Sequence, residues 1–308
     1  MIGMRGLING DDCNTDKNWR LEIRDWRLWL IIPTMPTLLS LVSDLFFSVQ
    51  IQNAAKQLGW DWVNVETAAQ IPVQPSLAPR PGSPIAAQTD SVGHNFIAHV
   101  AELQPALILV ELRSPGSEAT GNSQTLPWEQ WVAAAKTSPA IRRIPILAFG
   151  SHVDLEQRQR ALAAGCDEVV SKGRFTSAML ELLQKHARLP EPATAQTVAE
   201  GELSELARKG IELFNRGEYF EAHEELERAW NEEGGPAREL YRGILQIAVA
   251  YLQITRRNYN GAIKMFLRAR QWLDPLPDIC RGVNVAALRK DAAEVRAALE
   301  TLGAERIG

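Results

Sequence analysis

The sequence predicts an α/β domain with a parallel sheet, followed by an all-helical domain of about five helices. Short apolar runs alternate with amphipathic stretches in the first half, which is typical of alternating strands and helices. A stretch rich in proline, alanine and threonine comes next, and from there apolar residues recur at helical spacing. We therefore expect an N-terminal extension at 1–35, the α/β domain at 36–188, a linker at 189–201 and the helical domain at 202–308.

The expected strands of the first domain are continuously apolar, as strands buried on both faces of a parallel sheet are. They lie at 37–43, 60–65, 105–112, 145–150 and 167–171. Amphipathic stretches with helical period separate them, at 48–59, 93–104, 127–138, 154–166 and 176–187. The segment 70–88 breaks this rhythm with five prolines, which predicts an exposed loop.

Composition limits the classes of function. The formal charge of −4 and the pI near 5.8 give no overall basic field, so we expect no nucleic-acid partner. Cys13, Cys166 and Cys280 are too few and too far apart for a disulfide framework or a CxxC pair, which favours a reducing cytoplasm.

The residues before and at the first expected strand include an apolar stretch, 27–49, that is long enough to cross a bilayer. Pro33, Pro36 and Asp44 interrupt it, and a buried strand followed by a helix explains the same residues without penalty. We expect no membrane association. Residues 1–34 show no signal-peptide order. We expect them to be disordered, or to be untranslated if Met35 is the true start of translation.

The segments PALILVELRSP and ALAAGCDEVVSKGRF, together with the order of elements, resemble response-regulator receiver domains over about 150 residues. The resemblance implies a flavodoxin-like sheet. It also implies a phosphorylation site: an acidic pair for Mg²⁺ after the first strand, a nucleophilic aspartate after the third, a hydroxyl residue after the fourth and a lysine after the fifth.

Only part of that site is present in this chain. Ser43 and Asp44 stand at the acidic pair, Glu111 replaces the aspartate, Gly150 replaces the hydroxyl residue, and Lys172 matches the lysine. Glutamate carries its carboxylate one methylene further out, and a single acid holds Mg²⁺ poorly. We expect a pseudo-receiver that does not accept phosphate. A salt bridge between Lys172 and Glu111, mimicking a permanently switched state, is the simplest role for these two residues.

The second domain shows five stretches of helical spacing, beginning near Leu203, Tyr219, Glu239, Ala262 and Val285. The third is apolar nearly all round and is expected to be central, so Gln246 and Gln253 within it need buried partners. FNRGEYFEAHEEL aligns with ITRRNYNGAIKMF at an offset of 40 residues. This internal echo predicts two stacked helical hairpins, too few for a solenoid.

The residues FNRGEYFEAHEELERAW, GILQIAVAYLQITRRN and GAIKMFLRA resemble the helical family catalogued as domain of unknown function 309, from Leu203 to about Leu302. The family signature HxxxExxW is His223, Glu227 and Trp230 in this chain. The resemblance implies a metal-binding role, because the family has been supposed from this motif to bind metal. It also implies that a histidine of the third helix is replaced by Gln253.

On a helix, His223 and Glu227 lie on one face, and together they make half of a transition-metal site for zinc, iron or manganese. The third ligand would come from Gln253, Asp278 or Cys280. The competing interpretation is structural: His223 lies within the buried stripe and hydrogen-bonds Glu227 and Gln253 beneath Trp230. The motif and its expected pocket comprise Trp230, Gln246, Gln253, Tyr219 and Glu224, and Glu224 is expected to pair with Arg228 on the solvated face.

No serine, cysteine or threonine stands beside a base in a recognisable motif, so no catalytic residue is assigned. We interpret the chain as a bacterial-type signalling or protein-interaction protein. Its receiver-like domain would engage a protein partner or a second copy of the chain. Its helical domain would act as a binding domain. The alternative is a metal-dependent, hydrolase-like activity centred on His223 and Glu227.

Overall fold

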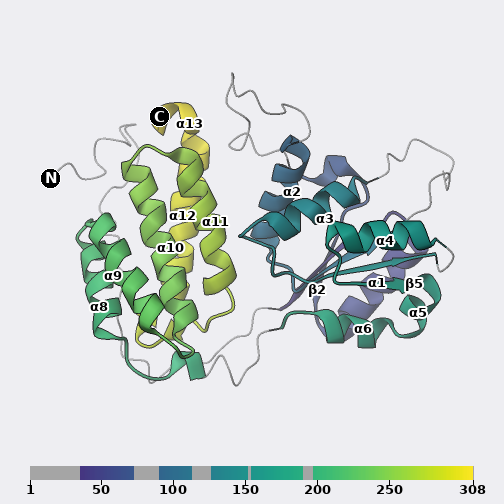
Figure 1. The fold of residues 1–308 in the computed structure, drawn as a ribbon, viewed down its shortest axis with the longest axis horizontal. Helices are drawn as coiled ribbons and strands as arrows, with labels where there is room; N and C mark the ends of the chain where they lie inside the picture. Colours follow the sequence, from purple (N-terminus) through teal and green to yellow (C-terminus); the bar gives the residue numbers. More distant parts are fainter. Residues whose placement is uncertain (1–34, 73–89, 113–125, 152–153, 190–196, 308) are drawn as a thin grey trace. The chain divides into compact units, whose positions relative to one another are not determined.

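The computed structural model describes residues 35–72, 90–112, 126–151, 154–189 and 197–307, drawn in colour in Figure 1. They form two compact units, an α/β unit within residues 32–190 and a helical unit within residues 191–308. The expected N-terminal extension up to residue 34 and most of the expected loop at 70–88 lie outside the described residues. No helix among the described residues has the length and apolar character needed to cross a bilayer.

The α/β unit contains a parallel five-stranded sheet in the order β2-β1-β3-β4-β5. This is the flavodoxin-like order, so the predicted fold class is confirmed. In such a sheet the carboxyl ends of the strands meet at one edge, beside the point where the strand order reverses. The strands are β1 (Thr37–Leu41), β2 (Asp61–Asn64), β3 (Leu107–Glu111), β4 (Ile146–Gly150) and β5 (Glu168–Ser171).

Helices cover both faces of the sheet (Figure 1). On one face Phe96 of α2 stacks on Trp131 of α3, with ring centroids 4.8 Å apart. On the other face α1 and α6 pack over the sheet, and the side chain of Phe47 lies in the same core as Phe149 and Phe175. The helices are α1 (Leu45–Leu58), α2 (Asp90–Leu103), α3 (Trp128–Thr137), α4 (Leu155–Ala164), α5 (Lys172–Ser177) and α6 (Met179–His186), with a short 3-10 turn at Ala68–Gln70.

The last expected helix of this unit, 176–187, differs from the structure. The chain forms two helices, α5 and α6, that are separated at Ala178, where the backbone leaves the helical region with a φ of −125°. The first of these helices begins at Lys172, four residues before the expected start. Phe175 explains this, because its ring stacks on that of Phe149 in β4, with ring centroids 4.1 Å apart, and anchors α5 to the sheet.

The helical unit confirms the predicted all-helical region. Its central helix α10 packs against α9 and α11, and ten of its residues are buried. A two-stranded hairpin, β6–β7, was not predicted, because two-residue strands carry no periodic signal. The elements are α8 (Glu205–Asn215), α9 (Tyr219–Glu232), α10 (Arg238–Thr255), α11 (Tyr259–Leu273), β6 (Ile279–Cys280), β7 (Val283–Asn284), α12 (Val285–Leu302) and α13 (Ala304–Ile307).

The hairpin β6–β7 holds the segment that enters the helical unit. The Arg281 backbone N–H donates to the Ala199 carbonyl at 2.8 Å, and the Arg281 guanidinium donates to the carbonyls of Val198 and Glu202. Residues 198–201, placed by the sequence in the linker, therefore lie against the helical unit together with Glu202.

The internal echo of the sequence corresponds to two turns of the same geometry. Between α8 and α9, the Glu218 N–H donates to the Leu213 carbonyl, and Gly217 has a φ of +83°. Between α10 and α11, the Asn258 N–H donates to the Gln253 carbonyl, and Arg257 has a φ of +55°. The second turn thus places an arginine in the left-handed conformation that glycine supplies in the first.

We predict that Arg257→Gly stabilises the protein. A non-glycine side chain in the left-handed region costs about 1–2 kcal/mol of stability. Glycine removes this cost, but its greater freedom in the unfolded chain destabilises the folded state by about 0.5–1 kcal/mol. The expected net gain in stability is about 0.5–1 kcal/mol. The matched control is Gly217→Ala, which should destabilise by about 1 kcal/mol. Urea unfolding of both variants measures the two free energies, and changes of the same sign would contradict the prediction.

Candidate functional site

The three residues predicted at the receiver-like site converge at the carboxyl edge of the sheet. Glu111 ends β3, Asp44 follows β1, and Lys172 follows β5. Lys172 Nζ donates to Glu111 Oε1 at 2.8 Å, and the Asp44 backbone N–H donates to Glu111 Oε2 at 3.2 Å. The Glu111 side chain is 1% exposed and that of Lys172 is 36% exposed, so a buried carboxylate is neutralised by a lysine that still reaches solvent.

The other groups at this edge are engaged in structural contacts. Asp44 Oδ1 accepts from the Phe46 N–H at 2.9 Å and so caps the first turn of α1. The Lys172 ammonium lies 4.8 Å from the centroid of the Phe47 ring. With Ser43 at the other position of the acidic pair, these residues do not fit a magnesium site.

Gly150 has a packing reason for lacking a side chain. A Cβ at this position would lie 2.8 Å from the Leu112 Cβ, closer than packed carbon atoms approach. Leu112 is buried, and its N–H donates to the Phe149 carbonyl, so it continues the pairing of β3 with β4. A hydroxyl residue at this position would therefore have to displace Leu112.

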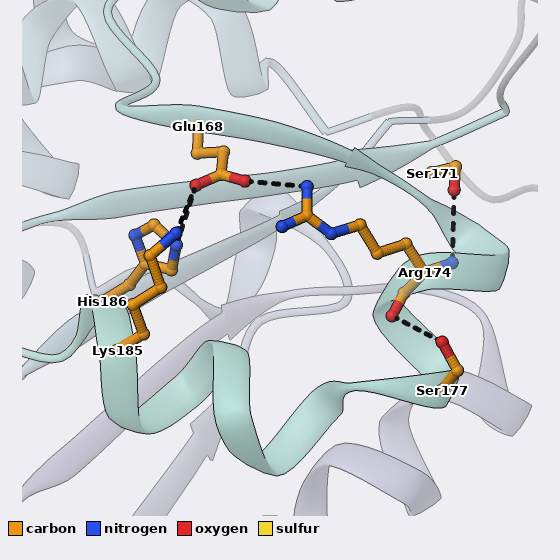
Figure 2. A network of polar contacts seen from close by, with 6 residues as sticks. All are labelled: Glu168, Ser171, Arg174, Ser177, Lys185 and His186. Atoms are coloured by element: carbon orange, nitrogen blue, oxygen red, sulfur yellow. Dashed lines mark hydrogen bonds and ion pairs between the residues drawn. The ribbon is translucent and has the colours of Figure 1, made fainter.

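A second set of charges surrounds Glu168, the first residue of β5 (Figure 2). Its carboxylate accepts from Arg174 of α5 at 3.1 Å and from Lys185 of α6 at 3.3 Å, and it lies 3.0 Å from His186 Nε2. Burial by itself raises the pKa of Glu168. The hydrogen bond from Lys185, together with the charges of that lysine, His186 and Arg174, outweighs burial and lowers this pKa below its ordinary value of 4.5.

The motif residues of the helical unit all lie on α9, as predicted. His223 Nε2 and Glu227 Oε2 are 3.7 Å apart, too far for a hydrogen bond. The side chains are 30% and 48% exposed, so His223 is half-buried rather than within the buried stripe, which corrects the expectation. The expected bond to Gln253 also differs, because Gln253 Oε1 accepts from Asn258 Nδ2 at 2.7 Å.

The candidate third metal ligands are used elsewhere. Asp278 forms an ion pair with Arg289. Cys280 is fully buried, its Sγ lies 3.2 Å from the Val198 carbonyl, and burial raises the pKa of its thiol to about 12. Since metals bind the thiolate, this cysteine is a poor ligand. Within the described ranges, no cluster of three or more His, Cys, Asp or Glu side chains could hold a metal ion.

Two arginines that sequence reasoning missed flank Trp230. The guanidinium carbons of Arg238 and Arg242, on α10, lie 4.7 and 5.0 Å from its ring centroid, and that of Arg242 lies 4.0 Å from the Trp272 ring. The two arginines are one helical turn apart and come directly after the chain reversal that follows Trp230. This spacing is the signal that could have revealed them.

The remaining predicted pocket residues do not gather in one place around His223. Tyr219 belongs to an aromatic cluster with Phe214 and Tyr251, and burial raises its pKa. Glu224 is exposed, and Arg228 pairs with Glu225 at 3.0 Å instead of with Glu224. The Oε1 atom of Gln246 is buried without a hydrogen-bond partner among the described residues.

Comparison with known proteins finds a family match within the helical unit. The family model described as Domain of unknown function (DUF309) matches residues 207–265. An uncharacterized protein of Aquifex aeolicus (strain VF5) is 31% identical over 109 residues, which span 34% of this chain and 30% of that protein. The chain therefore joins a helical unit that contains a match to the DUF309 model to an α/β unit with the flavodoxin-like strand order.

Solved receiver structures align with about half of the chain. The chemotaxis protein CheY4 of Vibrio cholerae aligns at 12% identity with a TM-score of 0.34, over 50% of this chain and 99% of that one. A CheY-like receiver domain protein of Methanospirillum hungatei JF-1 aligns at 14% identity with a TM-score of 0.32, over 49% of this chain and 93% of that one. The phosphorylated cyanobacterial phytochrome response regulator RcpA aligns at 13% identity with a TM-score of 0.32, over 49% of this chain and 91% of that one. The fold class itself rests on the strand order.

We predict that Gly150→Ser destabilises the protein by about 1–3 kcal/mol, because the new side chain must displace Leu112 in a packed interior. Gly173→Ser is the matched control, since nothing lies within 4 Å of a Cβ at that position. The control should change the free energy of unfolding by no more than about 0.5 kcal/mol. Equal costs in urea unfolding would show that Leu112 does not restrict position 150.

Glu168 should make stability depend on pH in the acid range. Because its pKa is lowered on folding, its contribution is present above the unfolded value and is lost as pH falls through the folded value. The difference in unfolding free energy between wild type and Glu168→Gln should therefore be constant near neutrality and shrink below about pH 4.5. Denaturant titrations over this range measure it, with the exposed Glu181→Gln as control. A difference that stays constant down to about pH 3 would contradict the assignment.

Proposed function

We propose that the chain is a signalling or protein-interaction protein of bacterial type. In this proposal the receiver-like unit does not accept phosphate, and the helical DUF309 unit provides a binding surface. The observation that carries the proposal is the 2.8 Å ion pair between Lys172 and Glu111 at the place of the phosphorylation site.

The surroundings of this ion pair support the proposal. A phosphoryl acceptor needs an exposed nucleophilic carboxylate and a bound cation to neutralise the incoming phosphate. Here Glu111 is buried and already neutralised by Lys172, and Leu112 fills the space beside Gly150. The pair resembles the contact that a phosphorylated carboxylate would make with the same lysine, so the unit would stay in one state without chemistry.

A unit held in one state can act as a constitutive docking module. It exposes large apolar side chains on α1 and α4, among them Leu45 and Phe46, which follow Asp44, and Leu155. We propose that a protein partner or a second copy of the chain engages this unit. Both described cysteines are buried free thiols, which fits a reducing cytoplasmic setting.

We predict that acetyl phosphate with Mg²⁺ adds no phosphate to the protein, because Glu111, at the place of the nucleophile, is buried and paired with Lys172. Intact mass spectrometry measures the adduct. The phosphorylated response regulator RcpA, treated in parallel, is the positive control. A stoichiometric adduct that disappears in Glu111→Gln would refute the proposal.

A metal-dependent hydrolase is the second candidate, on the observation that His223 and Glu227 lie 3.7 Å apart and partly exposed on one helical face. This pair supplies two ligands, and catalytic zinc sites use three protein ligands and an open position. Asp278 and Cys280 are engaged elsewhere, so the described residues fit the metal incompletely. For this reason the binding role is preferred.

Thermal unfolding with and without EDTA decides between the two. If His223 is structural, His223→Ala should lower stability by about 1 kcal/mol through lost packing, and EDTA should change neither protein. If it ligates a metal, EDTA should destabilise the wild type and leave the alanine variant unaffected, because the binding energy of the ion is folding energy. Glu224→Ala, an exposed neighbour on α9, is the control.

A further inference from the structure

Arginine and tryptophan side chains alternate across three helices of the helical unit. The order is Arg238, Trp230, Arg242 and Trp272, with guanidinium-to-ring distances of 4.7, 5.0 and 4.0 Å. Trp230 comes from α9, both arginines from α10, and Trp272 from α11. We call this set of four side chains the Arg–Trp ladder.

The two arginines have different roles in the ladder. Nη1 of Arg238 donates to the carbonyls of Trp230 and Glu233, at 2.8 and 3.0 Å, and so closes the end of α9. Arg242 has its guanidinium carbon near two indole rings. A guanidinium that stacks on rings uses its flat faces for that contact. Its five N–H donors point outward in its plane, so donors remain for a ligand even when a protein group accepts from one of them. Arg242 is therefore held in a fixed orientation, and binding a planar or tetrahedral oxyanion would cost it little conformational entropy.

Two polar atoms, one on the Trp230 ring that Arg242 contacts and one on the same helix as Arg242, lack partners among the described residues. Trp230 Nε1 and Gln246 Oε1 are both buried, and among the described residues neither has a hydrogen-bond partner. Gln246 lies one helical turn after Arg242 on α10, so the two side chains share a face. Buried polar groups in native proteins are almost always satisfied by protein, water or ligand. An unsatisfied donor on the ring that Arg242 contacts, and an unsatisfied acceptor one turn along the same helix, indicate the chemistry of a ligand.

We propose that Arg242, Trp230 and Gln246 bind an oxyanion that also carries a hydroxyl group, such as hydrogen phosphate or a hydroxycarboxylate. The oxyanion accepts from the Arg242 guanidinium and from Trp230 Nε1–H. The hydroxyl group donates to Gln246 Oε1. This assignment rests on the binding role proposed for the helical unit and names its ligand class, and it uses no residue of the receiver-like site.

The ladder argues against two other classes of ligand. A cationic ligand would need the faces of the tryptophans, and these lie against the protein's own guanidinium groups. A metal ion would need carboxylate, imidazole or thiolate groups, and arginine supplies none of these.

The test titrates inorganic phosphate, at constant ionic strength in Tris chloride, into the full-length ¹⁵N-labelled protein. The Trp230 indole N–H signal, assigned with Trp230→Phe, should shift saturably. Arg242→Gln should weaken binding by about tenfold or more, since it removes a charge-assisted contact. Arg242→Lys, which keeps the charge but loses the planar fork, should bind with intermediate affinity and also serves if the glutamine variant fails to fold. Arg228→Gln, an exposed arginine on α9, should bind as the wild type does.

A second comparison separates the sources of the oxyanion and tests the role of Gln246. Lactate should bind more tightly than propionate, which lacks the hydroxyl group, and Gln246→Leu should abolish that difference.

Binding of phosphate alone would assign a phosphate ligand, and binding of lactate alone would assign a hydroxycarboxylate ligand. The proposal is overturned if neither anion shifts the Trp230 signal, or if Arg242→Gln binds them as well as the wild type does. Neither result would bear on the acetyl phosphate experiment, so the receiver-like proposal stands or falls separately.

Discussion

Burying the carboxylate of Glu111 imposes the constraint on which the carboxyl edge of the sheet depends. A buried charge is costly unless it is paired and hydrogen-bonded, and Glu111 satisfies this need with Lys172 and with the backbone N–H of Asp44. These three residues follow or end three different strands, so the two contacts of Glu111 link the carboxyl ends of β1, β3 and β5 across the edge. Leu112 and Gly150 complete the edge by packing. The same arrangement leaves the Glu111 carboxylate buried and paired, which supports the proposal that this unit does not accept phosphate.

In the helical unit, guanidinium groups stabilise the places where helices end. Arg238 donates to carbonyls at the end of α9, and Arg289 donates to the carbonyls of Leu273, Asp274 and Leu276 after α11. Terminal carbonyls have no partner within their own helix, and a fork of N–H donors can satisfy several of them at once. Arg242 differs from these two because it lies between aromatic rings. This difference is why a ligand is assigned to Arg242 and a structural role to the others.

We propose different kinds of function for the two units. The receiver-like unit has the flavodoxin-like strand order, and an ion pair joins Glu111 to Lys172 at the carboxyl edge of its sheet. The helical unit has a half-buried histidine beside an exposed glutamate, and close by in the sequence a tryptophan whose indole N–H has no partner among the described residues. The unsatisfied Trp230 and Gln246 atoms support the proposal of ligand binding by the helices. The ion pair of Glu111 with Lys172 supports the proposal that the sheet unit docks a protein without phosphoryl chemistry.

The sequence by itself determined the fold class, since apolar runs and helical spacing follow directly from which faces are buried. It also determined that Asp44, Glu111 and Lys172 meet, because carboxyl ends of parallel strands share an edge. It did not determine the partners of side chains on neighbouring helices: Arg238 and Arg242 at Trp230, Asn258 at Gln253, or Arg289 at Asp278. Those contacts depend on the rotation of each helix about its axis and on turn geometry. Packing of the whole unit sets both, and periodicity along one segment carries no information about them.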